Sequence, residues 1–393
     1  MNNVLVIGAG ASGMLAALTA AENAENRVTL IERQARAGRK LAATGNGRCN
    51  LSNMNASPEH YHGEDVSFMH PAMEAFTAES TLEYFKSLGL ISSIQYGGRV
   101  YPLSDSANSV VDVLRFALEK AGVNLITGQQ IRSTIKKGEG FAAFSDESEY
   151  RADKLIIACG GLAGGKLGGV KDGYDFLRSF GHSCTRLYPA LVPVSTEGDF
   201  TRSLKGVRAE AEIKLNGRVS RGELQFTETG VSGPAVFDVS RTAALDGGTM
   251  EIDFLAGDIL PMLIKRRAEM PKLESQSLLT GMLHNRLGLV IVKRCGIKPS
   301  APLESLSTAE LEKVAHCCSC FTLTVKGTSG FDSAQITVGG IKTSEFSPET
   351  LESRLVKGLY ACGEVLDIDG DCGGFNLQWA WASGRLAGQL KHD

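Results

Sequence analysis

The chain begins with a glycine-rich turn between an apolar segment and a helix-forming segment, which constrains the fold more than any other feature. Val4–Ile7 predicts a buried strand, residues 8–13 (GAGASG) match the pattern G-x-G-x-x-G, and a helix is expected over Met14–Glu22. A second apolar segment, Val28–Ile31, ends at Glu32, about twenty residues past the turn. Such a turn approaches a pyrophosphate, and such an acid accepts hydrogen bonds from a ribose. The N-terminus therefore predicts a βαβ unit that binds a dinucleotide, either NAD or FAD.

Length and composition narrow the class of protein. The chain has 393 residues, of which 43% are hydrophobic and 22% charged, and its net charge is -3. These values are ordinary for a globular protein of two or three domains. Lys and Arg are scattered along the sequence, so no basic patch indicates a nucleic-acid partner, which argues against a flavoprotein that modifies tRNA.

The apolar N-terminus resembles a targeting or membrane segment only superficially. A signal peptide would begin with Lys or Arg, and residues 1–3 contain neither. Glycines, together with Ser12 and Thr19, interrupt the apolar run that a membrane segment would need. No other apolar run is long enough to cross a bilayer. We therefore expect no membrane association and a cytoplasmic location.

The nine cysteines are mostly scattered through the sequence. The dense group His316–Cys320 contains the C-x-x-C spacing, between Cys317 and Cys320. Adjacent cysteines rarely face one ion, and no second C-x-x-C completes a four-thiolate site. A redox pair would open a helix after a strand, whereas this group precedes the strand-like Phe321–Val325. We therefore expect free thiols and no metal.

The middle of the chain differs in pattern from its two ends. It predicts a hairpin over residues 209–226 with Asn216-Gly217 at the turn, and helical periodicity over residues 260–316. Both ends instead alternate short apolar strands with helices, and a last helix is expected over Leu377–Leu390. This order indicates a nucleotide-binding domain that is split by an insertion of strands and helices.

Three strand ends contain glycine, namely residues 8–13, Ala158–Gly161 and Gly363-Glu364. In a doubly wound sheet, ligands lie beyond the carboxyl ends of the strands. A strand end that returns from the far C-terminus suits the extended shape of FAD better than NAD, so the sequence favours FAD.

A glycine- and asparagine-rich segment runs from Arg33 to Asn53. Its composition predicts an irregular loop, whose N–H groups would face a flavin edge. The cations Arg39, Lys40 and Arg48 would neutralise a pyrophosphate or an anionic flavin ring.

Five glycine-containing segments occur together with the N-terminal turn in this chain. They are residues 38–53 (GRKLAATGNGRCNLSN), 158–161 (ACGG), 339–341 (GGI), 363–367 (GEVLD) and 373–380 (GGFNLQWA). With the N-terminal turn, this set resembles a bacterial family of FAD-binding flavoproteins that are either aminoacetone oxidase-like or bile-acid 3-dehydro-Δ4,6-reductases. The resemblance spans essentially the whole chain.

The resemblance implies an α/β fold with three parts. A Rossmann-like FAD-binding domain of the two-dinucleotide-binding type would cover residues 1–190 and 336–393. A β-barrel-like domain over residues 191–257 and 320–335, and a small helical domain over residues 258–319, would be inserted into it.

The resemblance also implies which residues hold FAD. The N-terminal turn would bind the pyrophosphate, Glu32 the adenosine ribose, and the backbone of Ile131 the adenine. The remaining residues would line the pyrophosphate, the isoalloxazine, and the ribityl and pyrimidine side. The implied set is Gly8, Gly10, Ser12, Gly13, Glu32, Arg33, Arg39, Lys40, Thr44, Gly45, Asn46, Gly47, Arg48, Cys49, Ile131, Ala158, Gly160, Gly363, Glu364, Gly374, Phe375, Asn376 and Leu377.

The reaction is left open between two enzyme classes and one other function. A reductase would pass hydride from NAD(P)H through flavin N5 to an activated, enone-type C=C bond, such as one in a steroid or bile acid. An amine oxidase would instead use oxygen, and a non-catalytic module would only transfer electrons or bind a protein. We favour the reductase, with a small-molecule substrate, because an aromatic cage for an amine is not evident. Candidate catalytic groups are Tyr188, His182, Tyr101 and Cys49. The oligomeric state is left open.

Overall fold

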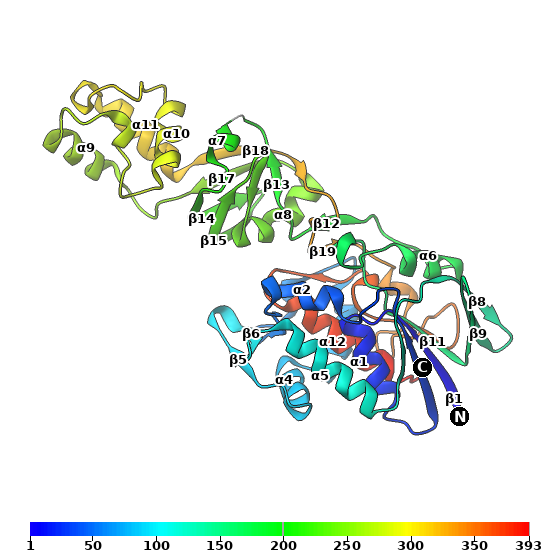
Figure 1. Cartoon of the computed structure of the whole chain (residues 1–393). Coiled ribbons are helices and arrows are strands. Elements are labelled where there is room, and N and C mark those ends of the chain that lie inside the picture. The colour runs from blue at the N-terminus through cyan, green and yellow to red at the C-terminus, as the bar shows by residue number, and fades with distance from the viewer. Residues whose placement is uncertain (199, 393) are drawn as a thin grey trace. The chain divides into compact units, whose positions relative to one another are not determined.

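The structure is a computed structural model that describes residues 1–198 and 200–392. The chain forms two compact units (Figure 1), the first from Met1–Tyr188 and Gln335–Asp393 and the second from Pro189–Ala334. Each unit has its own buried apolar core. The sequence predicted that the first domain covers residues 1–190 and 336–393. The division of the insertion into separate barrel and helical domains stays a prediction.

A parallel sheet with the strand order β20-β11-β1-β2-β7 forms the centre of the first unit. The strands are β1 (Asn2–Ile7), β2 (Asn26–Ile31), β7 (Asn124–Ile126), β11 (Lys154–Ile157) and β20 (Leu359–Ala361). All neighbouring strands in this sheet run parallel. The apolar side chains of β1, β2, β11 and β20 are buried, as expected for strands covered on both faces, whereas Leu125 and Ile126 of the edge strand β7 are half-buried. The carboxyl ends of β1, β11 and β20 therefore meet at one edge, although they come from both ends of the chain.

The first and last long helices pack against each other closely. In Figure 1, α1 (Ala11–Ala20) lies beside α12 (Phe375–Gly388). A Cβ atom on Gly384 would lie 2.4 Å from the carbonyl oxygen of Ser12, and one on Gly388 would lie 2.5 Å from that of Ala16. Glycine at these positions lets the two backbones touch, which brings both chain ends to the same side of the sheet.

The other elements of the first unit surround this centre. Its helices are α2 (Arg39–Gly47), α3 (His70–Ala75), α4 (Ala78–Ser87), α5 (Ala107–Lys120) and α6 (Asp172–Ser179). Its short strands are β3 (Ser52–Asn53), β4 (Tyr61–His62), β5 (Ser92–Ile94), β6 (Arg99–Pro102), β8 (Ile131–Lys137), β9 (Gly140–Ser145), β10 (Glu149–Ala152), β19 (Ile336–Val338) and β21 (Asp369–Gly370), and β12 (Tyr188–Ala190) begins here.

The expectation of an irregular loop from Arg33 to Asn53 is wrong at residues 39–43, where the backbone of α2 is helical. Lys40 and Leu41 begin a stretch of good helix formers, and Leu41 is buried. The backbone leaves the helical region at Thr44, Gly45 and Asn46. The glycine and asparagine at residues 45 and 46 therefore interrupt the helix, as their composition suggested, while the residues before them are helical. The last helix likewise begins at Phe375, two residues before the expected start.

The second unit contains a closed antiparallel barrel with the order β13-β16-β15-β14-β17-β18. Its strands are β13 (Val194–Thr196), β14 (Arg208–Leu215), β15 (Arg218–Phe226), β16 (Gly230–Ser232), β17 (Thr249–Asp253) and β18 (Phe321–Thr328). The predicted hairpin is β14–β15, and both turn residues, Asn216 and Gly217, have positive φ angles of 47° and 83°, as a type I′ turn requires. The predicted fold class, a Rossmann-like domain split by a barrel-containing insertion, is confirmed.

Helices complete the second unit. They are α7 (Phe200–Leu204), α8 (Pro234–Asp246), α9 (Leu260–Glu269), α10 (Asn285–Arg294) and α11 (Thr308–Ser319). Cys317 and Cys318 lie on α11, and the cysteines are free thiols. Among residues 1–198 and 200–392, no group of His, Cys, Asp and Glu is placed to hold a metal ion. Within the same ranges, no helix combines the length and apolar character needed to cross a membrane.

Candidate functional site

The N-terminal turn is closed on its inner side and open on its outer side. Gly8 has a φ of +105°, and a Cβ there would lie 2.4 Å from the carbonyl oxygen of Ala158. A Cβ on Gly13 would lie only 1.8 Å from the carbonyl oxygen of Gly8. A Cβ on Gly10, in contrast, would meet no atom within 4 Å. The turn therefore packs tightly against the end of β11 and leaves room for a ligand over Gly10.

The start of α1 offers hydrogen-bond donors to that open space. Gly10 is the N-cap residue, and no side chain caps this helix end. No acidic residue lies in the first turn. The first N–H groups of a helix have no acceptor within the helix, and the helix dipole is positive there. This end of α1 is consequently suited to bind a phosphate.

Glu32 is fixed beside the turn by two backbone hydrogen bonds. Its Oε2 accepts from the N–H of Ala9 and its Oε1 from the N–H of Gln34, both at 2.8 Å. The N–H of Gln129 donates to the carbonyl oxygen of Glu32 at 3.0 Å, and β8 begins two residues later with Ile131. The carboxylate and the Ile131 segment thus lie together, where the sequence placed the adenosine end of the ligand.

An ion pair joins distant parts of the chain at the same edge of the sheet. Nζ of Lys40, on α2, lies 2.8 Å from Oε2 of Glu364. The other carboxylate oxygen of Glu364 accepts from the N–H of Thr337 at 2.6 Å. Gly160, just after β11, is also close, since a Cβ there would lie 3.8 Å from Oε2 of Glu364. The structure therefore brings Lys40, Gly160 and Glu364 together.

Two C-terminal glycines bring the end of the chain to this edge. A Cβ on Gly363 would lie 2.5 Å from Oγ of Ser12, on α1, and one on Gly374 would lie 2.4 Å from the carbonyl oxygen of Ser52. Gly374 is the N-cap residue of α12, and no side chain caps this helix either. A second helix N-terminus with free donors thus belongs to the first unit.

Two buried polar atoms support a ligand in this region. Oδ1 of Asn50 and Nε of Arg33 have no hydrogen-bond partner among the described residues. An unpaired buried polar group costs about 1–3 kcal/mol. The Asn50 oxygen faces α12, because a Cβ on Gly374 would lie 2.9 Å from it, and Arg33 follows Glu32. A ligand with a polar ring at one end and a nucleotide at the other would satisfy both atoms, and FAD fits this requirement.

Other predicted cofactor residues direct their polar side chains toward the protein. The Arg48 guanidinium is paired with Asp105 and lies 4.3 Å from the ring centroid of Tyr101. Nη1 of Arg39 donates to Oε1 of Gln34 at 2.7 Å. The Asn376 side chain bonds to the backbone of residues 370 and 371. These side chains fix the surrounding loops, so Lys40 is the cation that lies with the glycine-containing strand ends.

The candidate catalytic groups differ in their surroundings. Cys49 is buried, and burial raises the pKa of its thiol to about 12, so the thiol is neutral. Both ring nitrogens of His182 are engaged at 2.9 Å, by Glu345 and by Ser353, which leaves none free to donate a proton to a substrate. Tyr188 is half-buried, with the Arg186 guanidinium 4.9 Å from its ring centroid.

Sequence reasoning missed one polar cluster near this edge, formed by His60, His62 and Asp371. The only local signal is the pair of histidines two residues apart, although His60 ends a 3-10 helix and only His62 lies in β4. Their acidic partner lies 311 positions from His60, too far for any local pattern to show.

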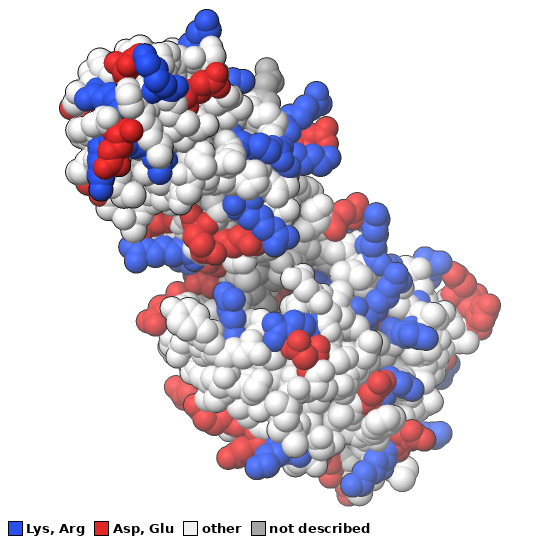
Figure 2. Space-filling model, turned by 60° about the vertical axis from the view of Figure 1, so that its left-hand side comes forward, with Lys and Arg blue, Asp and Glu red and all other residues white. Residues whose placement is uncertain are grey.

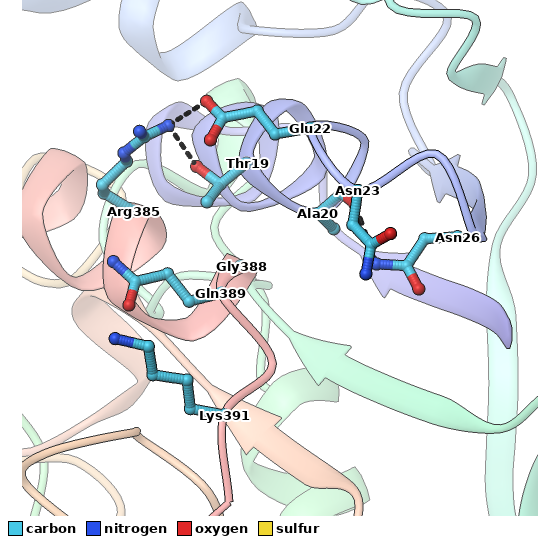
Figure 3. A pocket seen from close by; sticks show the side chains of 9 residues that line it. All are labelled: Thr19, Ala20, Glu22, Asn23, Asn26, Arg385, Gly388, Gln389 and Lys391. Carbon is cyan, nitrogen blue, oxygen red and sulfur yellow. Dashed lines mark hydrogen bonds and ion pairs between the residues drawn. The ribbon is translucent and has the colours of Figure 1, made fainter.

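A separate surface cavity of about 350 Å³ lies at the C-terminal ends of α1 and α12 (Figure 3). Within it, Nη1 of Arg385 lies 3.2 Å from Oγ1 of Thr19 and also pairs with Glu22. Asn26, the first residue of β2, also lines it. The cavity is therefore at the opposite edge of the sheet from the glycine-rich turn and is not part of the dinucleotide site.

The fold and the site define a dinucleotide-binding protein of the flavoprotein type. Residues 2–390 match the family of the HI0933-like protein Rossmann domain, and the chain belongs to this family. It is 38% identical to the 3-dehydro-bile acid delta(4,6)-reductase of Clostridium scindens, over 99% of this chain and 98% of that protein.

Two further relatives carry a different name. The ribosomal RNA dihydrouridine synthase of Escherichia coli is 32% identical over 97% of this chain and 96% of that protein, and that of Haemophilus influenzae is 28% identical over 96% of both. The family resemblance seen in the sequence is confirmed, and the protein is an FAD-dependent oxidoreductase.

Proposed function

We propose that this protein reduces a carbon–carbon double bond conjugated to a carbonyl group, with NAD(P)H as the electron donor and FAD as the hydride carrier. The observation that carries the proposal is shared chemistry. One relative is named a delta(4,6)-reductase and two are named dihydrouridine synthases, and each of these two names describes saturation of such a bond. A reduction of this type needs a bound flavin, a hydride donor and a source of one proton.

The site residues of the first unit would divide the work of holding FAD. The N-terminus of α1 would bind the pyrophosphate, Glu32 and the Ile131 segment the adenosine, and Lys40 the negative charge between them. Asn50 and the N-terminus of α12 would hold the polar edge of the flavin ring. When bound, FAD supplies a hydride at one ring nitrogen, and the protein supplies position and a proton.

The aromatic residues support a reductase over an amine oxidase. The indole N–H of Trp379 donates to the carbonyl oxygen of Gly363 at 3.3 Å. The indole N–H of Trp381 donates to the carbonyl oxygen of Leu51 at 2.8 Å. Both tryptophans are buried in α12. Since they are engaged inside the protein, they are not available to form a cage around a neutral amine.

The substrate we favour is a small enone of the bile-acid or steroid type. The relative named for such a substrate shares 38% identity with this chain. Lys and Arg are interspersed with Asp and Glu over the face drawn in Figure 2, and the net charge is -3. RNA binding draws most of its affinity from cations that contact phosphates, so this surface favours a small molecule.

Uridine in ribosomal RNA is the second candidate substrate. The observation that favours it is the pair of relatives named for it, which cover nearly the whole chain. The reacting bond would be chemically equivalent, because the uracil double bond is also conjugated to a carbonyl.

Anaerobic stopped-flow spectroscopy tests the proposal. The FAD-loaded protein is mixed with NADH or NADPH, and the reduced protein is then mixed with a dienone bile acid, with ribosomal RNA or with an amine. We expect NAD(P)H to bleach the flavin and the conjugated substrate to restore its absorbance. Bleaching by amines alone would establish the oxidase instead. A flavin that neither NAD(P)H nor amines reduce would point to the non-catalytic module.

A further inference from the structure

Three titratable side chains of the first unit form a cluster that the proposed cofactor contacts do not use. Nδ1 of His60 lies 3.2 Å from Oδ2 of Asp371, and Nε2 of His62 lies 2.9 Å from Oδ1. Each carboxylate oxygen therefore faces one imidazole. The exposed fractions of the side chains are 32% for His60, 21% for His62 and 15% for Asp371. In contrast to His182, this cluster is accessible from solvent.

A short strand pair holds the cluster in place. Strand β4, which contains His62, pairs antiparallel with β21, and the N–H of Asp371 donates to the carbonyl oxygen of His60 at 2.9 Å. His60 is the last residue of a 3-10 helix (Pro58–His60) that leads directly into β4, and both histidines lie against the same carboxylate, Asp371. The Tyr61 hydroxyl donates to the carbonyl oxygen of Phe375 at 3.0 Å. The backbone thus fixes the histidines relative to the start of α12.

The cluster adjoins the C-terminal part of the proposed FAD site. The ring of His60 stacks on that of Phe375, with centroids 4.3 Å apart and planes at 19°. Phe375 is the first residue of α12 and directly follows Gly374, against which the unpaired Asn50 oxygen lies. Asp371 belongs to the same turn, three residues before Gly374.

We propose that His62, hydrogen-bonded to Asp371, donates the proton that completes the reduction proposed above, on which this inference rests. Hydride adds to the β carbon of the conjugated bond, and the π electrons move to the α carbon and the carbonyl oxygen as an enolate. The Nδ1–H of the His62 imidazolium then protonates the α carbon. The substrate gains one hydride, which NAD(P)H supplies, and one proton, which the neutral imidazole recovers from water.

The two histidines have different roles in this step. Nδ1 of His62 has no hydrogen-bond partner among the described residues, whereas Nε2 of His60 lies 4.0 Å from Oε1 of Glu59. Oδ1 of Asp371 lies 2.9 Å from Nε2 of His62 and so fixes the orientation of the ring. His60, stacked on Phe375, positions that carboxylate, and His62 presents the free nitrogen.

Neighbouring side chains are poorer proton donors. Burial raises the pKa of Tyr61 far above its usual range, and its hydroxyl already donates to Phe375. Burial also raises the pKa of Cys49, to about 12. The ring of Tyr101 is buried and covered by the Arg48 guanidinium.

The test measures flavin reduction by NAD(P)H and flavin reoxidation by the substrate separately, in the variants His62→Gln and Asp371→Asn. His392→Gln is the matched control, because Nδ1 of His392 also pairs with a carboxylate, Glu352 at 2.9 Å. His392 contacts Lys154, the first residue of β11, and so lies at the opposite edge of the sheet. The proteins are loaded with FAD, reduced by light and mixed anaerobically with the dienone or the RNA.

We expect His62→Gln to slow flavin reoxidation by about 100-fold or more, the usual contribution of a general acid. Asp371→Asn should slow it less, and His392→Gln should react at the wild-type rate. Reduction by NAD(P)H should be unchanged in all three. Wild-type reoxidation rates in His62→Gln would overturn the assignment of the donor. A wild-type protein that no conjugated carbonyl compound reoxidises would overturn the proposed function itself.

A second measurement does not depend on turnover. In protein with ¹⁵N-labelled histidine, binding of FAD should shift the ring signals of His60 and His62 and leave those of His392 unchanged. Signals of His60 and His62 that do not respond to FAD would overturn the placement of the cluster beside the flavin, even in a protein that is active.

Discussion

The two units of this protein use their polar groups in different ways. In the first unit, no side chain caps the N-termini of α1 and α12, and the Asn50 oxygen and the Arg33 nitrogen have no partner among the described residues. In the second unit, arginines are bonded to the unit's own backbone. Nη1 of Arg266 donates to the carbonyl oxygens of Leu278 and Thr280, and Nη1 of Arg267 donates to that of Leu306.

This contrast separates ligand binding from stability. Oγ1 of Thr196 in the second unit also lacks a partner among the described residues, and no side chain caps α8 or α9. In the first unit, however, such groups occur together with the glycine-containing strand ends and Lys40, as expected where a ligand completes the structure. Arginines bonded to loop carbonyls hold those loops in place instead. We therefore assign cofactor binding to the first unit, and we expect these second-unit arginines to affect stability and not flavin binding.

The largest expected effect distinguishes two glycines of the same turn. Gly13→Ala places a Cβ 1.8 Å from a carbonyl oxygen, so it should destabilise the first unit by about 3 kcal/mol or more. Gly10→Ala meets nothing in the FAD-free protein, so it should keep its stability and lose affinity for FAD. Thermal unfolding of the apoprotein and FAD titration measure the two quantities.

Gly330→Ala is the control for this pair, since a Cβ there, in the second unit, also meets nothing within 4 Å. It should change neither quantity. If Gly10→Ala bound FAD as tightly as Gly330→Ala, the open side of the turn would not face the cofactor.

Glu32→Gln tests the adenosine end of the site. The carboxylate accepts two backbone hydrogen bonds, and an amide can accept only through its single oxygen. We expect FAD affinity to fall by about 1.5–3 kcal/mol, the range for a hydrogen bond to a charged group. Isothermal titration of the apoprotein with FAD measures it, and Glu312→Gln, on the exposed side of α11, serves as control. Equal affinities in the two variants would remove Glu32 from the site.

Arg286→Met tests the assignment of the second unit. Nε of Arg286 donates to the carbonyl oxygen of Ser203 at 3.0 Å, and Nη1 donates to that of Lys205 at 3.3 Å. Loss of these bonds should lower stability by about 1–2 kcal/mol, while FAD affinity stays at the wild-type value. Urea unfolding measures the stability, and FAD titration measures the affinity. A loss of FAD affinity without a loss of stability would contradict the division of roles.

The smallest effect concerns acid stability. Burial lowers the pKa of His182, although Glu345 partly offsets the shift. Below about pH 6.5 the unfolded chain binds a proton at this residue that the folded chain does not, so stability should fall on acidification. His284 and His316, in the second unit, are exposed. His182→Gln should flatten the decline in unfolding free energy between pH 7.5 and pH 5.5, and parallel curves for both proteins would contradict this.

Local patterns in the sequence predicted the parts of the fold that depend on local chemistry. The N-terminal turn before α1 and the Asn216-Gly217 hairpin are examples, because positive φ angles and a strand–turn–helix order leave a signature within a few residues. Helix α2 was missed because Gly45 and Gly47 stand at its end, and their composition outweighed the helix formers before them.

The missed parts of the candidate site depend on partners far apart in the chain. Asn50 lies against Gly374, and His60 against Asp371. No spacing within one segment encodes such a pair, since the sheet register and the close packing of α1 on α12 create it. The glycine-rich C-terminal turn indicated that the chain returns to the site, but not which side chains it would meet there.

Hydrogen–deuterium exchange with and without FAD tests the central claim, that both ends of the chain build one cofactor site in the first unit. We predict that FAD slows amide exchange in residues 8–13, 39–50 and 363–377 together, and leaves the strands of the barrel unchanged. Protection of the N-terminal turn alone, with the C-terminal segments exchanging as in the apoprotein, would contradict the account.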